Sequence, residues 1–156
     1  MSRRGLALAA ALVVVATGVA AGISFAFRSG KSPELTPAAY LAQANAACVR
    51  YAKQLGRVQP PHDLTSFADV AASAGKALPV LEAQAAAVRK IVPPRAMAAR
   101  VRALTALVAR SNGYLRAALE AAKRHDRPAM GRALGAWLEA STDSHDAAVK
   151  LGFRCS

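Results

Sequence analysis

The sequence predicts an all-α protein: an up-down-up-down four-helix bundle preceded by one N-terminal transmembrane helix. Three observations predict this class. Apolar residues make up 54 % and aromatic residues only 5 % of the 156 positions, and a vocabulary of alanine, leucine and arginine favours helix. The chain opens with a long uncharged run from Gly5 to Phe27. Four later stretches carry apolar residues at helical spacing and are separated by proline-containing breaks.

The uncharged run is long enough to cross a bilayer. As a helix it would extend over ~34 Å, against a hydrocarbon core of about 30 Å. We expect residues 1–27 to act as a signal anchor that stays in the plasma membrane, with residues 5–27 in contact with lipid. The alternative is a signal peptide that is cleaved near Ala21, which would release the rest of the chain as a secreted protein.

The charges that flank this run leave its orientation nearly balanced. Arg3 and Arg4 precede the run and two basic residues follow it closely, so the positive-inside rule does not decide the topology by itself. The cysteines do: Cys48 and Cys155 lie near the two ends of the remaining chain, as in a disulfide that closes a domain. Because such bonds persist outside the reducing cytosol, we expect residues 28–156 outside in a single-pass arrangement.

The rest of the chain divides into a linker and a bundle. Residues 28–35 are polar and interrupted by glycine and proline, which is typical of a juxtamembrane linker. Residues 36–156 should form the extracytoplasmic helical bundle, in which short connections make successive helices antiparallel. The first helix should run from about Pro37 to Arg57, and the apolar seams of the next three from Phe67 to Val92, from Met97 to Ala122 and from Met130 to Leu151.

The helix boundaries have local signals. Thr36 followed by Pro37 is typical of an N-cap and first turn, and Asp126 or Arg127 should cap the last helix ahead of Pro128. Pro93 and Pro94 should end the second helix abruptly, because the residue before a proline avoids the helical region. The first helix should turn one face inward, made of Leu41, Asn45, Cys48, Ala52 and Leu55.

One proline falls inside a predicted helix. Pro79 leaves the carbonyl of Gly75 without a donor, and the missing Cβ of Gly75 lessens the clash with the proline ring. We therefore expect a kink in the second helix at this point. A functional hinge, or the wall of a ligand pocket, is the alternative interpretation.

The two cysteines are the most specific feature of the sequence. Cys48 lies on the inward seam of the first helix, and Cys155 follows the last helix. In an up-down bundle these two helices are neighbours, so the C-terminal tail can fold back onto the first helix. A Cys48–Cys155 disulfide would close about 100 residues and stabilise the fold by ~4–5 kcal/mol in the chain-entropy model. Free buried thiols and a redox or intermolecular role are the alternatives.

Several short motifs resemble a group of proteins. They are the run Asn45 to Cys48 in the first helix, the pair Pro93-Pro94, Asp126 at the last turn, and the C-terminal run Gly152 to Cys155. The chain is similar in these to uncharacterised, signal-anchored or secreted, Ala/Leu/Arg-rich helical proteins of high-GC Gram-positive bacteria. The resemblance implies an envelope location and the pairing of Cys48 with Cys155, and it implies no activity.

Catalytic and metal-binding patterns are missing from the sequence. The GxSxG, SxxK and HExxH patterns and the phosphate-binding glycine loops do not occur. His145 stands close to Asp143 and Asp146, but a histidine and the residue after it point apart on a helix. Glu139, Asp143 and Asp146 form one row, which is typical of a solvated helix face. We therefore expect no enzyme, no metal site and no cofactor.

The net charge of +12 supplies the one functional hint. A basic stripe recurs at multiples of seven on the third helix, opposite its apolar seam; it consists of Arg95, Arg102, Arg116 and Lys123. The stripe either solubilises the helix or contacts anionic lipid headgroups, wall polymers or an acidic envelope protein. We expect no nucleic-acid partner, because an extracytoplasmic location denies access and no recognition motif is present.

These observations favour a non-enzymatic, membrane-anchored extracytoplasmic helical module that has an interaction or structural role in the cell envelope. One alternative is a secreted or anchored bundle that binds a small ligand in a pocket near Pro79, and a weaker one is a helical enzyme of unknown type. An apolar pocket above ~300 Å³ with convergent polar groups would favour ligand binding.

Overall fold

The computed structural model describes residues 34–154. Within this range the chain is all-helical, with four α-helices and no strand: α1 (Pro37–Leu55), α2 (Phe67–Arg89), α3 (Arg95–Lys123) and α4 (Arg127–Lys150). These helices occupy the four stretches that the apolar spacing predicts, so the all-α class is confirmed. None of the helices in the described range is both long and apolar enough to cross a bilayer.

Some predictions fall on other residues. The anchor or signal peptide at 1–27, its cleavage near Ala21, the topology residues Arg3 and Arg4, and Cys155 all lie outside the described residues. These predictions therefore stay predictions.

The helix starts follow the predicted capping. The Thr36 hydroxyl accepts a hydrogen bond from the Ala39 N–H at 3.2 Å, and Pro37 occupies the first turn of α1. Asp126 caps α4 by accepting from the Ala129 N–H at 3.0 Å. Each cap satisfies an N–H that has no partner inside its own helix.

The end of α2 differs from the prediction. The helix ends at Arg89, so Val92 does not continue the apolar seam and is instead 75 % exposed. The two prolines that follow exclude helical geometry from the residue before them, which leaves Val92 in the extended connection to α3. Further back, α2 is assigned as one helix through Pro79, and the predicted kink there stays a prediction.

The buried face of α1 is shifted from the predicted one. Tyr40 and Ala44 are fully buried beside Cys48, whereas Leu41 and Asn45 are only half-buried. Cys48 belongs to both faces, so the two faces differ by about 60° of rotation, which is less than the roughly 100° between consecutive residues of a helix. The tyrosine ring decides between them, because it removes a large apolar surface from water.

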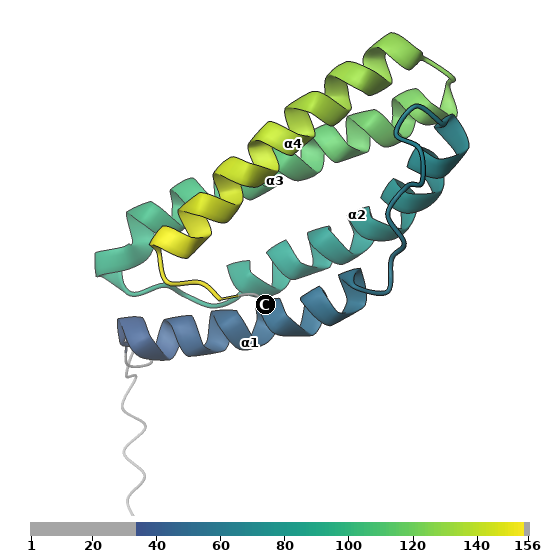
Figure 1. Ribbon diagram of the computed structural model, residues 1–156. Helices are drawn as coiled ribbons and strands as arrows, with labels where there is room; N and C mark the ends of the chain where they lie inside the picture. Colours follow the sequence, from purple (N-terminus) through teal and green to yellow (C-terminus); the bar gives the residue numbers. More distant parts are fainter. Residues whose placement is uncertain (1–33, 155–156) are drawn as a thin grey trace, which may run out of the picture. The chain divides into compact units, whose positions relative to one another are not determined.

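The four helices alternate in direction along the chain (Figure 1). The helix α3 packs closely against both α2 and α4, and α1 packs against α2. Among the described helices, α1 and α4 are not a closely packed pair. The C-terminal tail after α4 instead turns back toward α1 (Figure 1).

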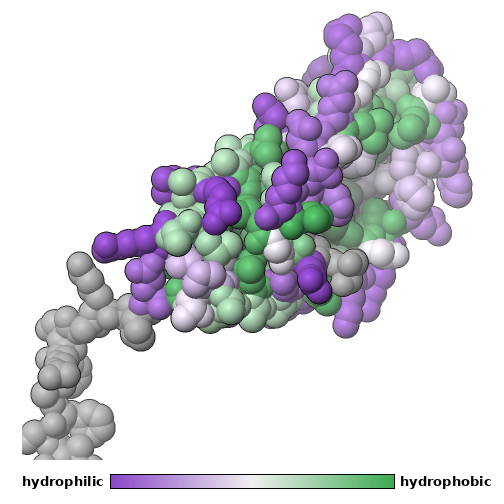
Figure 2. All heavy atoms as spheres, turned by 60° about the vertical axis from the view of Figure 1, so that its left-hand side comes forward, coloured by the Kyte–Doolittle hydropathy of each residue, from purple (hydrophilic) through white to green (hydrophobic). Residues whose placement is uncertain are grey.

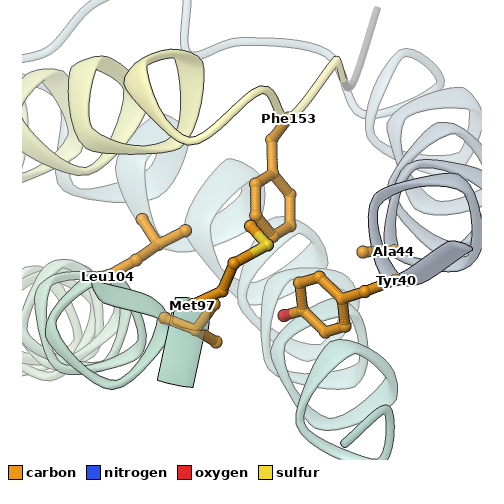
Figure 3. Close-up of a cluster of buried hydrophobic side chains, with 6 residues drawn as sticks. Tyr40, Ala44, Met97, Leu104 and Phe153 are labelled. Atoms are coloured by element: carbon orange, nitrogen blue, oxygen red, sulfur yellow. The ribbon is translucent and has the colours of Figure 1, made fainter. Parts of the chain in front are cut away.

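A cluster of buried side chains joins this tail to α1 and α3. Phe153 and Tyr40 meet edge to face with ring centroids 6.2 Å apart, and the Phe153 ring points from the tail toward Met97 (Figure 3). Ile91 and Leu151 pack against the same cluster. The end of α2, the start of α3 and the end of α4 therefore converge at one end of the domain.

The rest of the core is made largely of small side chains. Ala118, Ala121 and Ala122 of α3 are almost completely buried and pack with Val70 and Met130. Side chains this small let helix backbones approach closely. Alanine-rich faces therefore bring α2, α3 and α4 together here, with few aromatic residues in the core.

Candidate functional site

A cavity of about 250 Å³ lies between the helices and is partly open to solvent. Its walls come from all four helices and from the tail, and most are apolar. The main lining residues are Cys48, Gln84, Ala85, Val88, Val101, Leu104, Thr105, Val108, Ser144, His145, Ala148 and Phe153. The cavity lies where α1 and α4 do not pack directly and where Ala85 and Ala148 contribute little volume.

The polar groups in these walls are largely engaged. The Gln84 side-chain amide donates to Cys48 Sγ at 2.9 Å. The hydroxyl groups of Thr105 and Ser144 each donate at 2.9 Å to a carbonyl of their own helix, which leaves them able only to accept. His145 stands exposed among the lining residues. The cavity therefore offers an apolar interior with a few hydrogen-bond acceptors and one imidazole.

The size of the cavity limits what it can hold. It exceeds the ~150 Å³ of an engineered apolar cavity that binds benzene, and it lies below the ~300 Å³ at which drug-sized sites begin. It therefore suits a small apolar molecule of one or two rings. A wider depression of about 650 Å³ between α1 and α2 is an open surface groove, lined largely by alanine.

The predicted pocket near Pro79 is not where the cavity lies. Neither Pro79 nor Gly75 is among its lining residues, and the nearest part of its wall on α2 begins at Gln84. A Cβ added at Gly75 would lie 4.0 Å from Leu119 Cδ1, an ordinary contact with α3. Gly75 therefore faces the packed side of α2 and not the cavity.

The described residues do not form a metal-binding site. Residues 34–154 contain no group of three or more His, Cys, Asp or Glu side chains placed to hold a metal ion. Asp143 lies 3.7 Å from Arg110, in an exposed ion pair between α4 and α3. The acidic row on α4 thus meets a basic residue of its neighbour, as a solvated helix face does.

No family model, curated protein or solved structure matches this chain. Function is therefore inferred from the residues and their geometry. Two surfaces besides the cavity bear on it: the predicted basic stripe and the end of the domain where Phe153 packs.

The basic stripe is partly neutralised by carboxylates. Arg95 lies 3.9 Å from Glu34, Arg116 pairs with Glu82 of α2, and Lys123 pairs with Glu120 at 2.9 Å. All of these side chains are at least 43 % exposed, so each pair contributes little stability. Arg102 is exposed on the same helix. With three of its four cations paired, the stripe is a weaker anionic-contact surface than the sequence predicts.

A second basic surface was not predicted from the sequence. It lies where α2 ends, α3 begins and α4 ends, and we call it the turn end; it consists of Arg89, Lys90, Val92, Arg95, Val149 and Lys150. All six residues are exposed, and the two valines are 75 % and 55 % exposed. The signal in the sequence is the run Arg89 to Arg95, in which cations flank an apolar pair and two prolines.

The first described residues lie against the turn end. Glu34 Oε1 accepts a hydrogen bond from the Arg95 N–H, at the start of α3. This helix begins after Pro94 and has no side-chain cap of its own, so the Glu34 carboxylate accepts the hydrogen bond that a cap would accept. Its negative charge also interacts favourably with the positive end of the helix dipole. The chain therefore enters the domain beside the α2–α3 connection.

The C-terminal tail fixes the position of the residues before Cys155. The Phe153 N–H donates to the Ala148 carbonyl at 3.0 Å, and Gly152 adopts a φ of 90°. This is the left-handed conformation in which glycine commonly ends a helix. The Arg154 N–H then donates to Asn45 Oδ1 of α1 at 2.9 Å.

Proposed function

We propose that this protein is a non-enzymatic, membrane-anchored helical module with an interaction or structural role in the cell envelope. In this proposal residues 5–27 form a transmembrane helix, and residues 36–156 form an up-down-up-down four-helix bundle outside the plasma membrane. The observation that carries the proposal is the docking of the C-terminal tail on α1.

The docked tail supports a Cys48–Cys155 disulfide. Arg154 hydrogen-bonds to Asn45, which lies on α1 three residues before Cys48. Cys155 follows Arg154 directly, and consecutive Cα atoms are 3.8 Å apart, so a bond between the two sulfurs needs no large rearrangement. A structural disulfide persists outside the reducing cytosol, which favours export of the domain.

The interior supports a non-catalytic role. The hydroxyl groups of Thr105 and Ser144 donate to helix carbonyls, and Gln84 donates to Cys48. A nucleophile needs a base within hydrogen-bond reach, and these donors are directed elsewhere. The domain is therefore better suited to holding its shape and presenting its surface than to bond-making chemistry.

Labelling of intact cells tests the location. Cells that express the full chain are treated with a membrane-impermeant reductant and then with an impermeant maleimide. We expect labelling on intact cells only after reduction, at Cys155 and not at Cys48, which is buried in the folded domain. A cytosolic control protein should not be labelled. Labelling that requires lysis, with or without reductant, would contradict the proposal.

Fractionation separates anchoring from secretion. A retained anchor predicts that the chain stays in the membrane pellet after a wash at about 1 M salt and enters the supernatant only with detergent. Recovery of the chain in detergent-free culture medium would instead show cleavage near Ala21 and would refute the transmembrane anchor.

A second function, binding of a small apolar molecule, is favoured by the cavity of about 250 Å³. Benzene is a suitable probe, because it is smaller than the cavity and has no polar group. We expect saturable benzene-induced shifts of the His145 ring resonances in the purified full chain. The variant Ala85→Leu should abolish them by filling the cavity, while Ala83→Leu, at an exposed position of the same helix, should not. Shifts that never saturate, or that survive Ala85→Leu, would contradict binding in the cavity.

A further inference from the structure

We propose that the turn end rests on the surface of an anionic lipid bilayer, with Val92 inserted among the headgroups. The inference rests on the proposed membrane anchor and names the partner of the anchored domain. Three independent observations carry it: the charge of this end, its exposed apolar residues, and the place where the chain enters the domain.

The charge of the turn end is strongly positive. Arg89, Lys90, Arg95 and Lys150 are all exposed there, and Glu34 is the acidic residue in contact with them. The opposite end of the helices carries five exposed cations, but four carboxylates lie among them. The cations are Lys53, Arg57, Lys123, Arg124 and Arg127, and the carboxylates are Asp63, Asp69, Glu120 and Asp126. An anionic surface attracts each nearby Lys or Arg by about 1 kcal/mol and repels each carboxylate. The excess of cations is three at the turn end (four less one) and one at the opposite end (five less four), so an anionic surface favours the turn end.

Apolar side chains stand among these charges. Val92 is 75 % exposed, and Pro93 and Pro94 fix the backbone that follows it. Its neighbour Ile91 packs into the core, which holds the connection against the domain. Val149 of α4 is 55 % exposed near the same end. Figure 2 brings this side of the domain forward and shows hydrophobic and hydrophilic side chains next to one another on it. Exposed apolar residues ringed by cations are typical of a surface that settles into a headgroup layer.

The short connection to the predicted anchor also places the turn end, and not the opposite end, close to the bilayer. Glu34 contacts the first residue of α3, and seven peptide steps separate it from Phe27, where the predicted membrane span ends. Seven residues reach at most about 25 Å, so the turn end cannot move far from the bilayer. The opposite end is separated from it by the full length of α3, which for a helix of 29 residues is about 44 Å.

A single tryptophan at position 92 reports on contact with lipid. The full chain carrying Val92→Trp and Trp137→Phe is placed in lipid nanodiscs that contain either phosphatidylglycerol or only phosphatidylcholine. In the anionic discs we expect the tryptophan emission to shift to the blue and to be protected from quenching by acrylamide. Brominated lipid should quench the emission. The protection from acrylamide should decrease as the salt concentration rises. A matched chain with Leu64→Trp and Trp137→Phe has its tryptophan at the other end, where residue 64 is 52 % exposed, and should stay accessible in both discs.

Variants that remove positive charges test whether electrostatic attraction holds the turn end on the bilayer. Removing two cations with Arg89→Gln and Lys90→Gln should lower the ratio of docked to undocked domain about 25-fold, since each cation contributes about fivefold. The control Lys53→Gln and Arg57→Gln removes the same charge at the opposite end and should leave the ratio unchanged. Equal losses in both double variants would overturn docking of the turn end.

The remaining outcomes separate the two proposals. A chain that does not co-elute with the discs lacks the membrane anchor, which overturns the proposed function. A chain that co-elutes while the tryptophan introduced by Val92→Trp stays equally accessible in both kinds of disc overturns the docking inference alone. Protection that grows with protein concentration in detergent, without any disc, would assign the turn end to a second copy of the chain and also overturn the inference.

Discussion

Replacing Phe153 with alanine should loosen the whole C-terminal end of the domain. The ring is 6 % exposed and packs edge to face against Tyr40, although it stands on a tail only three residues beyond the end of α4. It is also part of the cavity wall, so the space left by its removal joins a void that already exists.

The magnitude follows from these contacts. Large-to-small substitution of a buried phenylalanine costs about 3–5 kcal/mol, of which the aromatic pair contributes about 0.5–1.5 kcal/mol. The tail lies outside the helices and can relax toward the gap, so the lower end of the range applies. We expect a loss of about 3 kcal/mol, which corresponds to a fall in Tm of about 12 °C for a domain of about 120 residues.

Thermal unfolding of the purified full chain, followed by far-ultraviolet circular dichroism, measures this loss. Leu138→Ala is the control, because Leu138 lies on α4 and is 52 % exposed; it should lower Tm by no more than a few degrees. The measurement is repeated with reductant present, which separates the packing of the ring from any covalent link at the tail. A loss below about 1 kcal/mol for Phe153→Ala under both conditions would refute the docking of the tail.

Three further predictions concern single polar groups. Tyr40→Phe should raise stability by up to about 1 kcal/mol in urea unfolding, because the buried Tyr40 hydroxyl has no hydrogen-bond partner among the described residues; a clear loss would mean that the hydroxyl is satisfied. Glu34→Gln should lower Tm by a few degrees, since it removes the charge that faces the start of α3, and an unchanged Tm would contradict that contact. Hydrogen bonds from the backbone N–H and the hydroxyl of Thr65 lower the pKa of Asp63, so this carboxylate stabilises the fold above its unfolded pKa and the contribution disappears as pH falls through its folded pKa. Asp63→Asn should therefore flatten the fall of Tm between about pH 5 and pH 2, and an unchanged slope would show that Asp63 does not contribute to it.

The sequence predicts the inward face of α3 best, because the apolar residues of this helix lie on one face. Met97, Val101, Leu104 and Leu115 are all buried as the spacing of α3 requires, and alternative faces of this helix carry arginine. The first helix is ambiguous because alanine is tolerated on any face. There the large ring of Tyr40 determines the inward direction, and this outcome depends on Phe153, which lies more than a hundred positions away.

Other features of the fold and of the candidate site depend on contacts between residues far apart in the sequence, and for this reason the sequence does not predict them. The Glu34–Arg95 contact and the Arg154–Asn45 hydrogen bond join residues 61 and 109 positions apart, and no periodicity encodes them. The cavity depends on which helix pairs stay apart, a property of the assembled helices. Heptad spacing within one helix predicts the basic stripe but does not reveal the Glu82 carboxylate of α2, which pairs with Arg116.

The helix α1 is the least embedded part of the domain. It packs against α2 and the tail, whereas α3 has a neighbouring helix on either side. In the proposed anchored protein, tension applied through the residues before α1 would therefore load the contact between α1 and α2 first. Because α1 and the tail form part of the cavity wall, detachment of α1 would uncover the interior while α2, α3 and α4 stay together. The amide protons of α1 should therefore exchange with solvent before those of α3.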